Sequence, residues 1–254
     1  MQNLPARAGV AAIEFGITEF GTCAKAPRSF EMWRFFVFLY RKGDASLGGV
    51  RKHYEQGPAA IESRSFEIIR DTLSCYAVDE RLLDVIVRVV HAGGDFNLAN
   101  LLGAADGAIG AAPAAFSKGG ELFCDVAMLA SGISRKECAR LGLQPVSFIH
   151  TAEAAARAEA GKITRAMAAV DMAVERGIRL FAFGNAPTAL FRLLEHCERG
   201  TAADFVCGMP VGFVGAADSK ADLAASGLPA IWLRGPRGGS GLCAACVNAL
   251  LRMA

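Results

Sequence analysis

The chain has 254 residues, of which 53% are hydrophobic, and its formal net charge is only +2. This length is sufficient for the core of one large domain. Basic and acidic residues are interspersed, so the sequence has no electrostatic footprint for a polyanion, and we expect no nucleic-acid partner.

The N-terminal part of the sequence resembles neither a membrane span nor a secretory signal. Its longest aromatic run, residues 35–40, lies between Arg34 and Arg41 and is far shorter than the roughly 18 apolar residues that a span needs. Glu14 and Glu19 interrupt any signal-like pattern. The eight cysteines lie in apolar or Ala-rich surroundings, which is typical of reduced thiols. We therefore predict a cytoplasmic protein with no transmembrane helix and no disulfides.

Residues 1–53 differ from the rest of the chain, because they contain an aromatic cluster and several glycines but no sustained helical period before residue 30. We predict an N-terminal extension over residues 1–53, whose composition is compatible with poor order, and one domain over residues 54–254.

Two helices are predicted after the extension. Pro58 suits a first helical turn, and apolar residues recur at helical spacing from Ile61 to Leu73. A second helix is predicted from Asp79 to Val90. Its apolar stripe ends at His91, just before Gly93 and Gly94 stop the helix.

The C-terminal half repeats a short apolar strand, a Gly-containing loop and a helix three times. The three strands are predicted over residues 179–183, 205–207 and 230–233, and further strands over residues 122–124 and 146–149. Strands that alternate with helices imply parallel pairing with right-handed crossovers. We predict a doubly wound α/β fold with a mainly parallel sheet, flavodoxin-like in plan, whose ligand lies outside the carboxyl ends of the strands.

The three loops are residues 184–186, 208–212 and 234–239. They offer backbone N–H groups beside helix N-termini, which suit carboxylates or phosphates. Their glycine spacing matches neither a Walker A loop nor a dinucleotide fingerprint. A nucleotide site, plain tight turns and a site for another anion all stay open at this point.

Histidine and cysteine patterns are also ambiguous. His91 could be a helix C-cap or a packed core residue instead of a functional group. The other histidines have no metal-ligand spacing, so we predict no metal site. Cys243 and Cys246 have the spacing of a thiol redox pair at a helix start, but they lie among small residues where cysteine is a common core residue.

Five sequence strings carry a family resemblance: SFEIIR from Ser65, VRVVHAGGDF from Val87, FAFGNAPTAL from Phe181, GMPVGFVGAADSK from Gly208 and RGPRGGSG from Arg234. In order and spacing they resemble the precorrin-8X methylmutase family, from about residue 54 to the C-terminus. The resemblance implies an isomerase of cobalamin biosynthesis that needs no cofactor. It would catalyse a 1,5-sigmatropic methyl shift at ring C, from precorrin-8X to hydrogenobyrinate or from cobalt-precorrin-8 to cobyrinate.

The resemblance also implies a site. His91 would be the catalytic residue that gives a proton or a hydrogen bond to the ring-C nitrogen. The implied substrate-binding residues are Ser65, Arg88, Thr164, Arg165, Gly184, Asn185, Thr188, Gly208, Met209, Pro210, Val211, Gly212, Arg234 and Gly235, with Arg237 as a further candidate. The expected partners are a tetrapyrrole substrate and a second copy of the chain in a homodimer. The alternative hypothesis is a non-catalytic tetrapyrrole- or nucleotide-binding protein on the same fold.

Two segments depart from the family's usual pattern. Gly93 and Gly94 follow His91-Ala92 where Thr-Gly or Cys-Gly is more common, and residues 103–110 are richer in Ala and Gly. The first departure should loosen the turn without removing His91.

Overall fold

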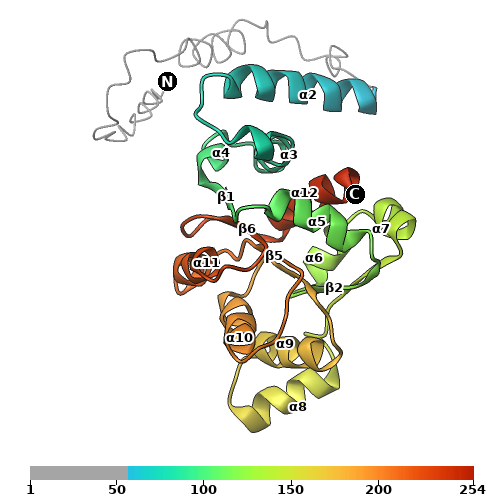
Figure 1. Cartoon of the computed structure of the whole chain (residues 1–254), viewed down its shortest axis with the longest axis vertical. Helices are drawn as coiled ribbons and strands as arrows, with labels where there is room; N and C mark the ends of the chain where they lie inside the picture. Colours follow the sequence, from blue (N-terminus) through green and yellow to red (C-terminus); the bar gives the residue numbers. More distant parts are fainter. Residues whose placement is uncertain (1–56) are drawn as a thin grey trace, which may run out of the picture. The chain divides into compact units, whose positions relative to one another are not determined.

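The computed structural model describes residues 57–254 (Figure 1). The predicted extension and its boundary at residue 53 lie outside the described residues. The helices are α2 (Pro58–Leu73), α3 (Leu83–Gly93), α4 (Leu98–Leu101), α5 (Ala108–Phe116), α6 (Ala127–Gly132), α7 (Arg135–Leu141), α8 (Ala152–Gly161), α9 (Arg165–Glu175), α10 (Pro187–Glu198), α11 (Ala216–Ala225) and α12 (Ser240–Met253), with a 3-10 turn, η1 (Glu80–Leu82). The strands are β1 (Leu102–Ala104), β2 (Gly120–Cys124), β3 (Leu143–Val146), β4 (Leu180–Phe183), β5 (Phe205–Gly208) and β6 (Ala230–Leu233).

The six strands form one sheet in the order β1-β6-β5-β4-β2-β3. Strands β2 to β6 pair in parallel, and β1 adds to the β6 edge in antiparallel orientation. Without β1, the order matches the flavodoxin-like plan, in which the chain reverses direction between the first and third strands. The predicted fold class is therefore confirmed, and the reversal point lies between β2 and β4.

Two edge strands differ from the prediction. The strand expected at residues 146–149 lies earlier, at β3, and contains Pro145. Proline is tolerated there because β3 pairs only with β2, so one side of the strand needs no ladder hydrogen bond. The three-residue β1 was not predicted, since Gly103 weakens its strand pattern; a side chain at Gly103 would meet the Trp232 ring of β6 at 2.7 Å.

Alternating strand residues divide the core into two hydrophobic layers. Leu122, Leu180 and Phe205 face one cluster with α3, α5, α6 and α12. Phe123 and Phe181 face the other cluster with α9, α10 and α11. Figure 1 shows these two groups of helices on opposite faces of the sheet. The sheet therefore holds both layers together.

Helix α3 packs against α12 and against α2. Its buried residues include Ile86, Val89 and Val90, which belong to the apolar stripe that the sequence pattern predicts. The helix ends where Gly94 adopts a left-handed conformation with φ of 61° and donates its N–H to the carbonyl of Val90. Glycine favours this C-terminal geometry because it has no Cβ. The end of α3 is thereby fixed next to His91.

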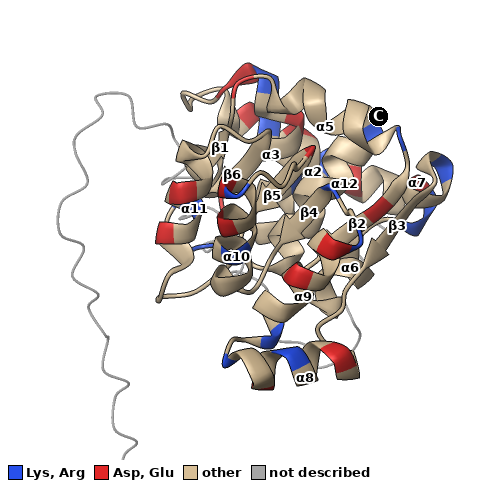
Figure 2. Ribbon diagram, turned by 60° about the horizontal axis from the view of Figure 1, so that its bottom comes forward, with Lys and Arg blue, Asp and Glu red and all other residues tan. Residues whose placement is uncertain are grey.

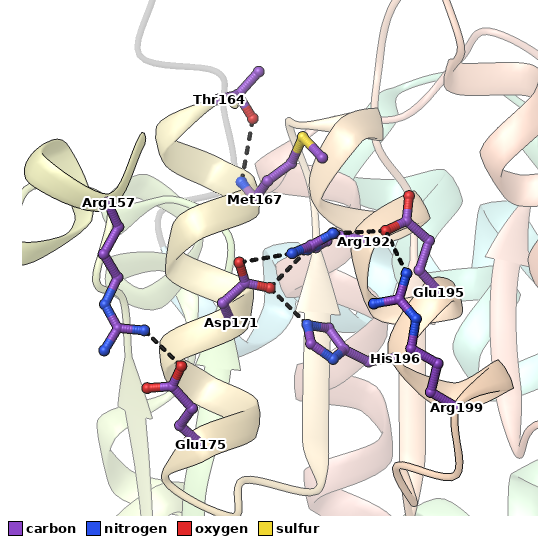
Figure 3. A network of polar contacts seen from close by, with 9 residues as sticks. All are labelled: Arg157, Thr164, Met167, Asp171, Glu175, Arg192, Glu195, His196 and Arg199. Atoms are coloured by element: carbon purple, nitrogen blue, oxygen red, sulfur yellow. Dashed lines mark hydrogen bonds and ion pairs between the residues drawn. The ribbon is translucent and has the colours of Figure 1, made fainter. Parts of the chain in front are cut away.

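Charged residues of both signs lie side by side on the surface of the described chain (Figure 2). Across α8, α9 and α10 they form the network drawn in Figure 3. Asp171 accepts hydrogen bonds from Nε of Arg192 at 2.7 Å and from Nε2 of His196 at 2.6 Å. Burial alone would raise the pKa of Asp171, but these partners outweigh it and lower the pKa. The network joins helices of the layer opposite α3.

None of the helices within residues 57–254 is long and apolar enough to cross a membrane.

Candidate active site

His91 lies in the last turn of α3, and its side chain is exposed. Its ring meets that of Phe66 from α2 edge to face, with 5.3 Å between centroids. One turn earlier, the guanidinium of Arg88 lies 4.9 Å from the centroid of the same Phe66 ring. Phe66 thus supports both side chains, and His91 is neither a buried core residue nor the residue at the C-cap, which is Gly94.

Arg88 and Ser65 have partners within the α2–α3 pair. Arg88 Nη1 lies 3.3 Å from a carboxylate oxygen of Glu62. Ser65 Oγ donates to the carbonyl of Ile61 at 2.7 Å, within its own helix. The structure therefore brings Arg88 and His91 together through Phe66, and it places Ser65 next to Phe66 on α2.

Ala92, the residue after His91, lines an open pocket of about 420 Å³. This volume lies within the roughly 300–1,000 Å³ that is common for ligand sites. Its lining comes from the end of α3, the following turn and α4, the loop after β5, and the loop and first turn after β6; the residues are Ala92, Gly93, Asp95, Leu98, Val211, Arg237, Gly238, Gly239, Gly241 and Leu242. The pocket is mostly apolar or glycine-lined. Of the expected site residues, it includes Val211 and Arg237.

The first Gly loop uses its N–H groups internally. The buried carboxylate of Asp125, directly after β2, accepts from the backbone N–H groups of Gly184, Asn185 and Ala186 at 3.0, 2.7 and 2.7 Å. Burial raises the pKa of Asp125, and these donors oppose the rise. In this structure these three N–H groups are therefore paired with a carboxylate of the protein itself.

Gly184 serves close packing as well. A side chain there would place its first carbon 2.7 Å from Cα of Ser240, the first residue of α12. At Gly184, the loop after β4 therefore packs directly against the first turn of α12. Sequence reasoning missed Asp125, although an Asp immediately after the apolar run of a parallel strand is a signal for this edge of the sheet.

The second and third Gly loops are joined to each other. The N–H of Gly239 donates to the carbonyl of Met209 at 2.9 Å, and that of Gly212 to Pro236 at 3.1 Å. Met209 is fully buried, so its side chain packs in the core. Gly208 lies against Leu223, and a Cβ there would overlap that side chain.

Lys220 of α11 ties these two loops from within. Its side chain is 1% exposed, and Nζ donates to the carbonyls of Pro210 at 2.9 Å and Arg237 at 2.6 Å. Burial lowers the pKa of Lys220 to about 8. Sequence reasoning missed this residue because a Lys on a helix is usually solvated.

Three expected contact residues lie over the other face of the sheet. Thr164 caps α9 by accepting from the N–H of Met167 at 3.2 Å, and its hydroxyl lies 3.1 Å from that of Thr188 at the start of α10. Arg165 is exposed beside Thr164. None of the three lines the pocket next to His91.

Arg234 and Gly235 shape the start of the third loop. Arg234 donates from Nη2 to the carbonyl of Asn100 at 2.6 Å, and its backbone N–H bonds to Leu101. Gly235 has φ of 75°, a conformation that glycine adopts readily. Arg234 thus fastens the loop to α4. The cation that lines the pocket is Arg237, and Arg234 is not among the lining residues.

Cys243 and Cys246 are fully buried core residues. Sγ of Cys243 lies 3.5 Å from Sγ of Cys207. Burial raises the pKa of the Cys243 thiol, which disfavours the reactive thiolate. Within residues 57–254, no cluster of three or more His, Cys, Asp or Glu side chains is arranged to hold a metal ion.

Known proteins are similar to this chain in sequence. The model of the precorrin-8X methylmutase family (CbiC) matches residues 60–253. The cobalt-precorrin-8 methylmutase of Salmonella typhimurium is 41% identical over 206 residues, which cover 78% of this chain and 97% of that protein. The precorrin-8X methylmutase of Pseudomonas aeruginosa is 37% identical, with 78% and 96% covered.

A solved structure agrees with these relatives. The crystal structure of precorrin-8x methyl mutase from Thermus thermophilus aligns with a TM-score of 0.72 and 34% identity, covering 77% of this chain and 95% of that one. The family match across almost all of the described residues, together with this shared fold, shows that the chain belongs to the precorrin-8X methylmutase family of isomerases.

Proposed function

We propose that the protein catalyses the 1,5-sigmatropic methyl shift at ring C of precorrin-8X or cobalt-precorrin-8, with His91 as the catalytic residue. The relatives are named for both substrates, so the proposal covers both. The observation that carries it is an exposed His91 directly before Ala92 and Gly93, which line an open, mostly apolar pocket. A flat macrocycle suits such walls, and imidazole suits proton exchange with a ring nitrogen.

In the proposed step, His91 gives a proton or a hydrogen bond to the ring-C nitrogen. This withdraws electron density from the ring and favours migration of the methyl group. The bond from the methyl carbon to one ring carbon breaks as the bond to the neighbouring carbon forms, within the conjugated system. No electrons are gained or lost overall, and the proton returns to His91 when the product leaves.

The remaining site residues would position the substrate. The Arg88 guanidinium lies over the Phe66 ring and so helps to keep the contact between Phe66 and His91 in place. Val211 would contribute an apolar contact from the loop after β5, since it is 44% exposed and lines the pocket. Preorganised contacts of this kind lower the cost of aligning a substrate.

The test is conversion of purified precursor, followed by its visible absorption, for the wild-type protein and for His91→Ala. We expect the wild type to change the chromophore over time. His91→Ala should lower kcat by about 10²- to 10⁴-fold, the usual contribution of a general acid or base, while product still binds. His150→Ala, which removes another exposed histidine, is the matched control and should retain the wild-type rate.

Three results would contradict the proposal. Normal turnover by His91→Ala would remove this residue from the mechanism. Binding of the tetrapyrrole by the wild type without any conversion would instead support the non-catalytic alternative. Activity lost in a folded Cys243→Ala/Cys246→Ala variant would favour thiol chemistry, although both side chains are buried.

We also propose that the enzyme acts in the cytoplasm as a homodimer. Unbonded thiols of Cys207 and Cys243 at 3.5 Å support a reducing compartment. The family resemblance supports the homodimer. A homodimer requires that the particle in solution has the mass of two chains.

A further inference from the structure

The pocket beside His91 has one cation and one carboxylate among its lining residues, Arg237 and Asp95. The two form an ion pair between Nη2 of Arg237 and Oδ2 of Asp95. The side chain of Arg237 is 48% exposed and that of Asp95 is 23% exposed. The guanidinium is therefore accessible from the pocket, while the carboxylate that orients it is mostly covered.

Asp95 is itself held in place on the turn that follows His91. Its Oδ1 accepts from the backbone N–H and from Nδ2 of Asn97, both at 2.9 Å. The backbone hydrogen bond is the largest cause that lowers the pKa of Asp95, with the contacts to Arg237 adding to it. Asp95 therefore remains a carboxylate at neutral pH and fixes the guanidinium relative to the end of α3.

The main chain of Arg237 is equally constrained. Lys220 donates to its carbonyl at 2.6 Å. The next residue, Gly238, lies so close to the carbonyls of Met209 and Pro210 that any Cβ would overlap them. With both its backbone and one edge of its guanidinium fixed, Arg237 has little rotamer freedom left to lose when it binds a ligand.

The geometry points to Arg237 as the anchor for one peripheral carboxylate of the substrate, with Asp95 as its positioning residue. This inference rests on the proposed function, because the substrate of that reaction is a macrocycle that carries carboxylates. Asp95 occupies part of the guanidinium fork, and the other N–H groups can bind a carboxylate in a planar, bidentate manner that Lys does not reproduce. Asp95 lies four residues after His91, just beyond the end of α3, so the anchor would set the distance between ring C and the imidazole.

The experiment measures KM and kcat for Arg237→Lys and Asp95→Asn with precorrin-8X or cobalt-precorrin-8. We expect Arg237→Lys to raise KM about tenfold with kcat within about twofold of wild type, because a contact made equally in ground and transition states affects binding alone. Asp95→Asn should raise KM less, about threefold, since the guanidinium remains but is no longer oriented by a charge.

A matched control is the ion pair of Arg179 and Asp204 at the amino edge of the sheet, whose side chains are 53% and 24% exposed. Arg179→Lys should leave both constants unchanged. A second readout uses a substrate analogue with its peripheral carboxylates converted to carboxamides. Wild type and Arg237→Lys should then have the same KM, because the anion that the anchor recognises is gone.

The outcomes separate this inference from the proposed function. Unchanged KM in Arg237→Lys, while the wild type converts substrate normally, would overturn the anchor and leave the activity intact. A tenfold rise that persists with the carboxamide analogue would also overturn it, since the effect would then come from pocket shape. Failure of the wild type to convert either substrate would overturn the proposed function itself.

Discussion

Asp125 is a single buried carboxylate that holds the loop at the reversal point of the sheet. It accepts three backbone hydrogen bonds from residues 184–186, the loop that leads into α10 at Pro187. Buried N–H groups of this loop would otherwise lack partners. Helix N-termini stabilise negative charge. The side chain therefore substitutes for the external anion that such loops bind in other α/β proteins.

Asp125→Asn should destabilise the protein by about 2–3 kcal/mol, because the amide has one acceptor oxygen and places an NH2 group against N–H donors. Urea unfolding followed by circular dichroism measures the change. Asp222→Asn, at an exposed position of α11, is the control and should change stability by less than about 0.5 kcal/mol. Equal stability of the two variants would show that the Asp125 hydrogen bonds contribute little.

Individual residues differ in how far the sequence foretells their roles. His91 was foreseeable, since a histidine at the end of an apolar stripe before two glycines must lie at a helix end. The structure adds that its ring is exposed and rests on Phe66. The pairing of Arg237 with Asp95 was not foreseeable, because the two are 142 positions apart and meet only through the packing of α3 against α12.

At the scale of elements, the loops after β5 and β6 behave as one unit because Lys220 links them. An ammonium with two carbonyl partners and no carboxylate is costly to bury. The lowered pKa of Lys220, about 8, expresses this cost. Above that pH the neutral amine still has two N–H groups, so both hydrogen bonds persist without the charge.

The free energy of unfolding should therefore rise with pH between about 8 and 10.5, because the unfolded chain keeps the Lys220 proton that the folded chain has released. Lys220→Met removes this contribution. Between pH 7.5 and 9.5, the stability of wild type relative to Lys220→Met should increase by about 2 kcal/mol, from roughly 1.36 kcal/mol per pKa unit. Denaturant unfolding at the two pH values measures it.

Lys136→Met, at an exposed position of α7, is the control and should keep the rise because Lys220 is intact. An identical pH dependence in wild type and Lys220→Met would mean that Lys220 is not desolvated in solution.

Elements also show why the sheet edges were harder to foresee than its centre. Central strands such as β4 are buried on both faces and consist of continuous apolar runs. The edge strands β1 and β3 contain Gly103 and Pro145, which weaken a strand pattern. Their strand conformation depends on pairing with a neighbour already in place, which is a tertiary effect that local sequence does not carry.

At the scale of the whole described domain, both hydrophobic layers depend on the same strands. Phe181 points into the layer of α9 and α10, and its neighbour Ala182 into the layer of α12. If the shared strands came apart, the apolar side chains of both layers would become exposed to solvent. We therefore expect residues 57–254 to unfold as one cooperative unit.

This cooperativity can be tested by weakening each layer separately. Phe181 lies 5.9 Å from Phe123 between ring centroids, and Leu250 is fully buried on α12 in the other layer. Phe181→Ala should cost about 3–5 kcal/mol and Leu250→Ala about 2–5 kcal/mol. In a Trp33→Phe background, Trp232 on β6 is the single tryptophan, so its fluorescence reports on the sheet while far-ultraviolet circular dichroism reports on the helices.

Within each variant, the fluorescence and circular dichroism signals should have one common denaturant midpoint, which is lower than that of the wild type. The reason is that a cavity in either layer reduces the stability of strands that the two layers share, so the loss spreads to the whole unit. If Phe181→Ala moved the fluorescence midpoint but left the helical signal at its wild-type midpoint, the layers would unfold independently.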